Sequence, residues 1–195
     1  MIDTLLKHKD KAKSSRILSK LNLNKNNYIV LTLHRPSNVD SKAGFENILS
    51  ILEKIQEKIK IVFPVHPRTA KNIKLFKLGK KMKSMKNLIL TGPSGYLDFM
   101  HLMANSKLVL TDSGGIQEET TVLGIPCITL RDNTERPVTV EQGTNLLVST
   151  DAQKVIEESL KAIGSKIKNY RKIPELWDGK ASQRIVRILT GNFMK

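Results

Sequence analysis

Short apolar runs alternate along the chain with stretches whose apolar residues recur at helical spacing. The runs are rich in leucine and β-branched residues, and they occupy residues 28–33, 61–63, 87–90, 108–111, 127–130 and 145–148. Because each run is continuously apolar rather than alternating, it is typical of a strand that is covered on both faces. The pattern therefore predicts a parallel sheet.

The segments between these runs keep the period of an amphipathic helix. One apolar stripe runs through residues 45–55, and a second runs through residues 97–103. Alternation of buried strands with helices is the signature of an open, doubly wound α/β fold, so the predicted class is α/β with a Rossmann-like parallel sheet. In such a sheet, ligands bind beyond the carboxyl ends of the strands.

Two further segments flank this predicted domain. Residues 3–21 predict a helix before the first strand, and residues 175–189, which contain Trp177, predict a terminal helix that packs on another surface. We therefore divide the chain into an N-terminal helix and domain-boundary segment at 1–25, a Rossmann-like domain at 26–172 and a C-terminal helix at 173–195.

The chain is strongly basic, with 33 Lys and Arg against 18 Asp and Glu and a formal net charge of +15. Such a charge indicates either a nucleic-acid or membrane-surface binder, or a basic protein with an anionic small ligand. The lysines spread over several helical segments, and aromatic residues, at 5%, do not interleave with them as a base-stacking surface requires. The preferred interpretation is a solvated lysine-rich surface, with no nucleic acid and no membrane as partner.

The remaining composition is that of a soluble globular protein. No apolar run approaches the ~18 residues of a membrane span, and Asp3 stands where a signal peptide carries positive charge. The single cysteine, Cys127, excludes an internal disulfide and fits a reducing cytoplasm. Its apolar surroundings predict a buried side chain rather than a nucleophile.

The first candidate site is the segment 111–119, Thr-Asp-Ser-Gly-Gly-Ile-Gln-Glu-Glu, which follows one of the predicted strands. Ser113 is a natural N-cap, and Gly114 and Gly115 remove Cβ atoms where a ligand would approach. The free N–H groups of the first helical turn and the positive end of the helix dipole suit a diphosphate. The alternative interpretation is a capped helix with a tight turn and no ligand.

Two acids, Glu118 and Glu119, follow in the same segment. Their carboxylates are hydrogen-bond acceptors and could receive the hydroxyl groups of a ribose. The segment is not a Walker A loop, because no Gly-Lys-Ser or Gly-Lys-Thr follows the glycines. It therefore indicates a nucleotide site of another kind.

Two loops after predicted strands pair a histidine with an arginine. His34 and Arg35 follow the first strand, where they suggest anion contact or proton transfer. His66 and Arg68 end the second strand in a loop that two prolines stiffen. A lone histidine is more often structural, but the arginine that directly follows His34 favours a functional interpretation there. The loop with His66 and Arg68 favours neither interpretation by itself.

A third loop, residues 131–137, has alternating charges between Arg131 and Arg136. These charges could satisfy one another or could reach a ligand. Together with the His and Arg loops they form a cationic rim around the start of a helix, which predicts a phosphorylated ligand. No Cys or His pair has the spacing of metal ligands, so we expect no metal and no cofactor.

Five stretches of the chain occur in the order and spacing of a known family. They are 32–40 (Thr-Leu-His-Arg-Pro-Ser-Asn-Val-Asp), 64–68 (Pro-Val-His-Pro-Arg), 95–99 (Gly-Tyr-Leu-Asp-Phe), 111–119 and 131–137 (Arg-Asp-Asn-Thr-Glu-Arg-Pro). Through them the chain resembles the non-hydrolysing UDP-N-acetylglucosamine 2-epimerases over nearly its whole length. The resemblance implies the C-terminal, UDP-binding half of a two-domain, glycosyltransferase-B-like architecture.

The resemblance also implies residue roles at the nucleotide. Ser113 and the N–H groups of Gly114 and Gly115 are expected to hold the diphosphate, and Glu119 the ribose hydroxyls. The main chain near Phe99 is expected to meet the uracil edge, and Arg136 to contact the pyrophosphate.

Two histidines are implied at the reacting end. His34 matches a histidine that the family places near the diphosphate and uses in catalysis, and His66 faces the interdomain cleft, where bacterial members can hold a second, activating UDP-sugar. The family reaction interconverts UDP-GlcNAc and UDP-ManNAc by eliminating UDP to give a 2-acetamidoglucal and then adding UDP back. A cationic pocket suits this reaction because it stabilises the departing diphosphate.

The chain departs from the family in one respect. Family members carry an N-terminal Rossmann-like domain with the acids that move the C2 proton. Residues 1–6 resemble the segment where family chains leave that domain, so we expect this chain to begin at the domain boundary and to lack those acids. The terminal helix resembles the one that crosses back to that domain, so we expect exposed apolar surface. The expected ligands are UDP and UDP-GlcNAc, and catalysis is expected only with a separate chain that supplies the first domain.

Other interpretations stay open at this point. The chain could be half of a UDP-sugar glycosyltransferase, a UDP-sugar-binding module without catalysis, or a nucleic-acid binder that uses the net charge of +15. It could also pair with itself as a homodimer.

Overall fold

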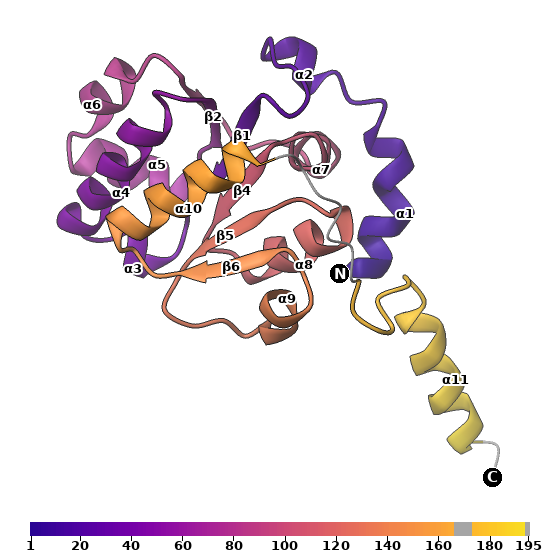
Figure 1. Ribbon diagram of the computed structural model, residues 1–195. Helices are drawn as coiled ribbons and strands as arrows, with labels where there is room; N and C mark the ends of the chain where they lie inside the picture. The colour runs from indigo at the N-terminus through magenta and orange to yellow at the C-terminus, as the bar shows by residue number, and fades with distance from the viewer. Residues whose placement is uncertain (166–172, 194–195) are drawn as a thin grey trace.

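The computed structural model of the chain describes residues 1–165 and 173–193 and contains a six-stranded parallel sheet with helices on both faces (Figure 1). The strands are β1 (Tyr28–Thr32), β2 (Lys60–Pro64), β3 (Leu88–Thr91), β4 (Leu108–Thr111), β5 (Cys127–Leu130) and β6 (Asn145–Val148). Each strand begins and ends within one residue of the bounds of the corresponding predicted run. The predicted α/β class and parallel sheet are therefore confirmed.

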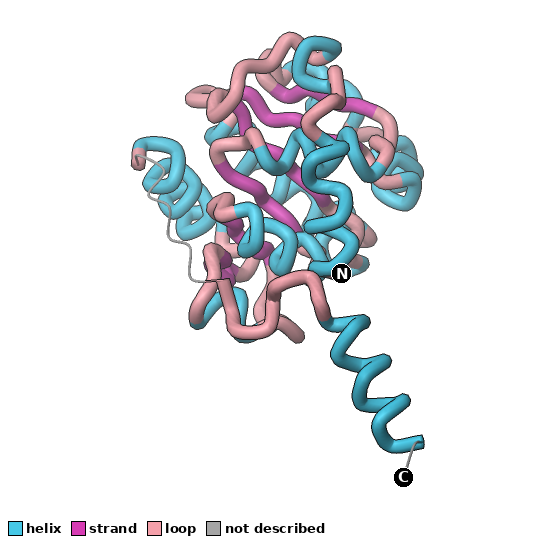
Figure 2. Tube along the Cα trace, turned by 90° about the vertical axis from the view of Figure 1, so that its right-hand side faces the viewer, coloured by secondary structure: helices cyan, strands magenta, loops and turns pink. Residues whose placement is uncertain are grey.

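Two layers of helices cover the sheet. The helices are α1 (Ile2–Ala12), α2 (Ile17–Lys20), α3 (Pro36–Val39), α4 (Lys42–Ile55), α5 (Pro67–Leu75), α6 (Gly79–Ser84), α7 (Tyr96–Ala104), α8 (Gly114–Leu123), α9 (Pro137–Glu141), α10 (Ala152–Gly164) and α11 (Ala181–Phe193). One layer contains α4, α5, α6 and α10, and the other contains α1, α2, α7 and α8 (Figures 1 and 2). Helix α11 lies outside both layers.

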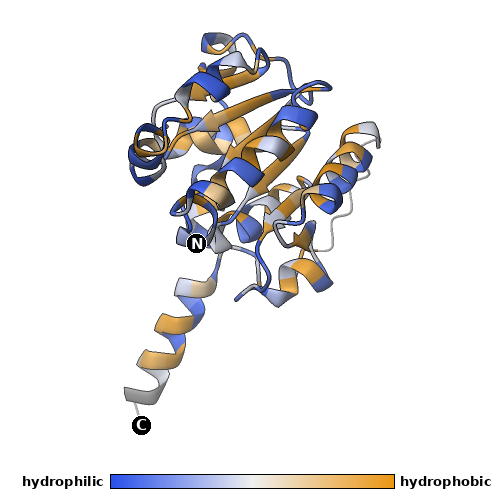
Figure 3. Cartoon of the chain, turned by 90° about the vertical axis from the view of Figure 1, so that its left-hand side faces the viewer, coloured by the Kyte–Doolittle hydropathy of each residue, from blue (hydrophilic) through white to orange (hydrophobic). Residues whose placement is uncertain are grey.

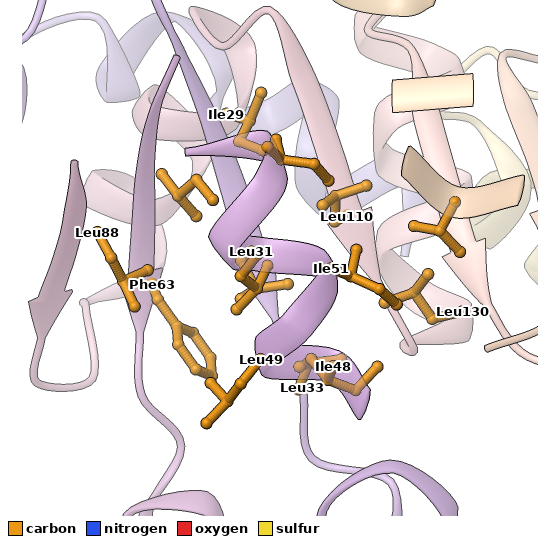
Figure 4. Packing of buried hydrophobic residues seen from close by; sticks show 14 of the residues in the cluster. Ile29, Leu31, Leu33, Ile48, Leu49, Ile51, Phe63, Leu88, Leu110 and Leu130 are labelled. Atoms are coloured by element: carbon orange, nitrogen blue, oxygen red, sulfur yellow. The ribbon is translucent and has the colours of Figure 1, made fainter. Parts of the chain in front are cut away.

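Successive strand residues enter opposite cores. Val30 of β1 and Val62 of β2 pack with α7 and α8, whereas Leu31 and Phe63 pack against α4 (Figure 4). Because both faces of the sheet are covered, both sets of side chains must be apolar, and the runs do not alternate.

Helix α4 shows how the local sequence produces this packing. Ser41 is its N-cap and accepts the N–H of Gly44 at 3.0 Å, which satisfies one donor of the first turn. The stripe predicted through residues 45–55 is fully buried against the sheet and against α10 (Figure 4). The prediction of an amphipathic helix here is confirmed.

The strand order β3-β2-β1-β4-β5-β6 positions the candidate site. The chain builds one half of the sheet outward from β1 and then returns to the other side of β1 with β4. The helices that follow these two neighbouring strands, α4 and α8, cover opposite faces. A crevice therefore opens beyond the carboxyl ends of β1 and β4, which is where doubly wound sheets bind ligands.

The predicted helix at 3–21 is two helices. α1 ends at Ala12 and α2 begins at Ile17. Between them Ser15 donates its hydroxyl to Asp98 of α7 at 2.5 Å and accepts the N–H of Ile17 at 3.1 Å. The Ser15 hydroxyl, which is bonded to α7, thus replaces a helical carbonyl as the acceptor of the Ile17 N–H, and the single-helix prediction is wrong at this point.

The predicted C-terminal helix begins later than expected, at Ala181. Gly179 has a φ of 80°, which interrupts a helix, and Asp3 of α1 accepts the N–H groups of Ala181 and Ser182 at 3.4 and 3.0 Å. Trp177 therefore lies before the helix, where it packs against the cluster that contains α1. The prediction that placed Trp177 on the helix is wrong.

Helix α11 extends away from the sheet and has an apolar stripe along its exposed surface (Figure 3). Ile185, Val186, Ile188 and Leu189 are 57%, 58%, 62% and 52% exposed. Over residues 1–165 and 173–193, no helix combines the length and apolar character needed to cross a membrane. Residues 166–172, at the predicted boundary between the Rossmann-like domain and the C-terminal helix, lie outside the described residues.

Replacing Leu49 tests the packing of α4. Leu49 is fully buried against the sheet, so Leu49→Ala is expected to lower the free energy of unfolding by ~3 kcal/mol through lost burial and a residual cavity. Ser50→Ala, at the exposed neighbouring position, is the control and should change stability by no more than about 0.5 kcal/mol. Urea unfolding measures both variants, and equal stabilities for the two would contradict this packing.

Candidate functional site

The four loops predicted to carry chemistry lie together at the carboxyl edge of the sheet. His34 and Arg35 follow β1, His66 and Arg68 follow β2, the segment 111–119 joins β4 to α8, and the loop 131–137 joins β5 to α9. Since β1 and β4 are hydrogen-bonded neighbours, the first and third of these loops flank the crevice where the strand order reverses.

The start of α8 leaves backbone donors open. Ser113 occupies the predicted N-cap position, but its side chain makes no capping hydrogen bond, and its own N–H is bonded to Thr111 Oγ1 at 3.0 Å. The first-turn N–H groups have no acceptor within a helix. A Cβ at Gly114 would meet no atom closer than Glu135 Oε2 at 3.6 Å, so packing does not require glycine there. The missing side chain instead leaves space for a ligand at these N–H groups.

Asp112 is a site residue that the sequence interpretation did not single out. Its side chain is 0% exposed, and its Oδ2 accepts the backbone N–H groups of His34 and Arg35 at 3.0 and 2.9 Å and the amide of Asn38 at 3.1 Å. Burial opposes its ionisation most strongly, yet the hydrogen bonds from His34, Arg35 and Asn38 lower its pKa overall. The only signal in the sequence was its place directly after a buried strand.

A small cavity lies beside α8. Its volume is about 200 Å³, and its lining comes from the ends of β1 and β2 and the starts of α7 and α8: Thr32, Leu33, His34, Pro64, His66, Pro93, Ser94, Phe99, Ser113 and Ile116. The imidazole centroids of His34 and His66 are 5.7 Å apart. The structure thus brings His34, His66, Phe99 and Ser113 together around one space.

Glu119 lies one turn after Gly115 on the same side of α8 and is 7% exposed. Its Oε1 accepts the hydroxyl of Tyr96 at 3.2 Å. Burial raises the pKa of Glu119 above its ordinary value of 4.5, outweighing the hydrogen bond from Tyr96, which lowers it. The second carboxylate oxygen is an acceptor suited to a hydroxyl group. Tyr96 could not be identified as the partner of Glu119 from the sequence, because the two residues lie on different helices.

The charges of the loop after β5 pair largely with one another. Arg131 donates to both carboxylate oxygens of Glu135 at 2.7 and 2.8 Å, and these bonds are the main cause of a Glu135 pKa of about 2. Arg136 Nε lies 2.8 Å from Glu118 Oε1, and Arg35 lies 3.6 Å from Glu135. Of the two open interpretations of this loop, mutual pairing is observed, and the Arg136–Glu118 pair links the loop to α8.

Arg68 does not line the cavity. Its guanidinium is paired with Asp40, at the end of α3, and this pair lowers the pKa of Asp40. Asp40 in turn accepts the amide of Asn72 at 3.0 Å. Arg68 therefore holds α3 against α5, and the structure does not place it with the predicted ligand contacts.

Two observations limit where other chemistry could occur. Across residues 1–165 and 173–193, no group of three or more His, Cys, Asp or Glu side chains could hold a metal ion. Cys127 is buried, as predicted, and burial raises its pKa to about 12.

A second, larger cavity of about 360 Å³ lies between α1 and α7. Lys9, Lys25 and His101 are among its lining residues, and none of the predicted site residues lines it.

The arrangement suits a phosphorylated ligand that also carries hydroxyl groups. Open N–H groups at the start of α8, with the helix dipole and the nearby Arg136, stabilise negative charge. The carboxylate of Glu119 can accept hydroxyl groups one turn further along. The imidazoles of His34 and His66 line the adjoining cavity and are groups that can exchange protons.

Comparisons of the sequence and of the structure with known proteins identify the same family. The sequence model of the UDP-N-acetylglucosamine 2-epimerase family matches residues 1–190. A UDP-N-acetylglucosamine 2-epimerase of Methanocaldococcus jannaschii is 48% identical over 165 residues, which are 84% of this chain and 44% of that protein.

Solved structures are similar over almost the whole chain. The M. jannaschii UDP-GlcNAc 2-epimerase in complex with UDP-GlcNAc and UDP has a TM-score of 0.84 and 43% identity, covering 97% of this chain and 52% of that one. The Neisseria meningitidis enzyme bound to UDP-GlcNAc has a TM-score of 0.77 and 31% identity, covering 97% and 53%. The chain therefore spans about half the length of the relatives that it matches.

The raised pKa of Glu119 predicts a pH-dependent stability difference. Glu119→Gln is expected to raise the free energy of unfolding at neutral pH by on the order of 1 kcal/mol, because a neutral amide replaces a buried carboxylate. Since the folded-state pKa exceeds the unfolded one, the contribution of Glu119 to stability falls as the pH rises between the two values. The gain in the variant should therefore be small below pH 4.5, grow above it and then level off.

Urea unfolding at a series of pH values measures this difference. Glu141→Gln, at an exposed position, is the control and should show no such trend. A Glu119→Gln variant that is less stable than the wild type at neutral pH would contradict the assignment of Glu119 as a carboxylate whose ionisation is opposed by burial.

Proposed function

Because the chain belongs to the UDP-N-acetylglucosamine 2-epimerase family, we propose that it forms the UDP-binding half of an enzyme that interconverts UDP-GlcNAc and UDP-ManNAc. The observation that supports this most directly is the start of α8, whose open N–H groups lie at the switch point between β1 and β4. The M. jannaschii and N. meningitidis structures hold UDP or UDP-GlcNAc, which are the ligands proposed here.

The proposed pose follows the polar groups of the site. The diphosphate lies on the N–H groups of Gly114 and Gly115, with the hydroxyl of Ser113 free to donate to it. Glu119 receives the ribose hydroxyls through the oxygen that Tyr96 leaves free. Arg136 turns from Glu118 toward the pyrophosphate, a small change because the pair is already beside the helix start.

The proposed reaction breaks two bonds on the sugar. Loss of the C2 proton and cleavage of the bond from C1 to the UDP oxygen give a 2-acetamidoglucal and UDP, and re-addition gives the epimer. Charge develops on the departing diphosphate, where the helix dipole and backbone donors are oriented in advance. His34 lines the adjoining cavity next to Ser113 and is the group proposed to exchange a proton there.

The base that removes the C2 proton is proposed to come from outside this half. No Asp or Glu of the described residues lines the cavity, and Asp112 is fully engaged by the loop after β1. We place the missing acids in the part of the relatives' length that this chain does not span. The exposed stripe of α11 is the proposed contact surface for that part, since its apolar side chains have no partner in the described chain.

UDP binding tests the nucleotide site. The wild-type chain should bind UDP in a calorimetric titration, and Gly114→Ala should weaken binding at least about tenfold, or ~1.4 kcal/mol, by placing a methyl group against the diphosphate. The same change should leave the fold intact or stabilise it by up to about 1 kcal/mol, because alanine is the better helix former. Gly79→Ala, where a Cβ meets nothing within 4 Å, is the matched control for UDP binding.

Two results would count against the proposed site. One is a folded wild-type chain that does not bind UDP, and the other is a Gly114→Ala variant that binds UDP as tightly as the wild type. Uridine, which lacks the diphosphate, should bind equally to the variant and the wild type.

Turnover tests the division of the active site. The isolated chain should not convert UDP-GlcNAc to UDP-ManNAc, and adding the N-terminal half of a related enzyme should restore conversion, which coupled chromatography of the two sugars measures. Leu189→Lys on the exposed stripe of α11 should prevent association with that half, whereas Gln183→Lys, at an exposed position near the helix start, should not. Robust conversion by the isolated chain would overturn the proposed division, and a self-associated chain that Leu189→Lys dissociates would assign α11 to a homodimer instead.

A further inference from the structure

The carboxylate of Asp112 contacts both main-chain and side-chain groups of the loop after β1. The carboxylate accepts the backbone N–H groups of His34 and Arg35, and it also lies 3.0 Å from Nδ1 of the His34 ring. The carboxylate is 0% exposed, whereas the His34 side chain is 39% exposed. One buried group thus holds the main chain of His34 and one edge of its imidazole, while the rest of the ring faces the cavity.

The chemistry of this contact determines which nitrogen carries the proton. An ionised carboxylate accepts hydrogen bonds and cannot donate them. The hydrogen bonds that lower the pKa of Asp112 keep it ionised despite its burial. Nδ1 of His34 must therefore be the donor, which leaves Nε2 as the nitrogen that exchanges a proton.

We propose that Asp112 is a positioning residue for His34: it holds the proton on Nδ1 and presents Nε2 to the cavity beside Ser113. The use of that nitrogen at a UDP-sugar rests on the proposed function, but the orientation itself does not. Because Asp112 and Ser113 are consecutive, a single peptide bond separates the group that orients His34 from the residue at the diphosphate site. The turn after β4 therefore sets the placement of the histidine relative to the nucleotide.

A purely structural role for Asp112 would explain only part of its contacts. If Asp112 were removed, the N–H groups of His34 and Arg35 would be left without an acceptor, and the amide of Asn38 would keep only its bond to the carbonyl of Leu130. These lost bonds are reason enough for an acid in this turn. The bond to Nδ1 is not needed to fold the loop, because the backbone bonds already fix it. The test must therefore report on the ring.

Long-range ¹H–¹⁵N NMR of the His34 ring reports on the tautomer directly. In the wild-type chain without nucleotide, above the ordinary imidazole pKa of about 6.5, Nδ1 should carry the proton. Asn38→Ala removes a different bond to Asp112 and should lower stability while leaving this tautomer unchanged. Asp112→Asn, whose amide can donate to the ring, should shift the proton to Nε2. If the wild-type His34 ring carries its proton on Nε2, the proposal is wrong. This measurement needs no variant, so it decides the proposal even if Asp112→Asn does not fold.

A double-mutant cycle on UDP binding tests whether Asp112 acts through His34. Asp112→Asn should change the Kd for UDP about tenfold in the wild-type background and less than about twofold in the His34→Ala background. Equal changes in the two backgrounds would overturn the positioning role. If the wild-type chain binds no UDP, the proposed function fails, while the tautomer measurement still decides the inference about Asp112.

Discussion

The buried carboxylate of Asp112 is the interaction on which the site depends. It lies at the end of β4 and collects donors from the loop after β1, across the pair of strands where the sheet order reverses. Burying a charge is costly unless it is fully hydrogen-bonded, so these donors and the carboxylate stabilise one arrangement of the two loops. That arrangement places His34 next to the first turn of α8.

The rest of the site is built outward from this junction. Helix α8 supplies open N–H groups in its first turn and the carboxylate of Glu119 one turn later. Arg136 is held beside this helix by its ion pair with Glu118. We propose that these groups bind and stabilise an anion, and that residues outside this half remove the carbon-bound proton. The half-length match to the relatives and the exposed apolar stripe of α11 support the proposal that a second half supplies those residues.

Much of the fold and the position of the site could be predicted from local sequence, because strands covered on both faces are apolar throughout and loops after parallel strands converge on one edge. What could not be predicted depends on distant pairs. Asp112 meets residues 74 to 78 positions away, and Ser15, whose bond to Asp98 divides the first helix, meets a residue 83 positions away. Whether Arg68 faces a ligand or Asp40 depends on the same kind of tertiary contact.

The central claim is that the first turn of α8 holds the diphosphate of UDP. Backbone amide NMR of the folded chain tests it most directly, by comparing titrations with UDP and with uridine. The amide signals of Gly114 and Gly115 should shift strongly with UDP and much less with uridine, because only UDP places phosphate oxygens on these donors. UDP binding that leaves both amides unshifted, or that shifts them no more than uridine does, would contradict it.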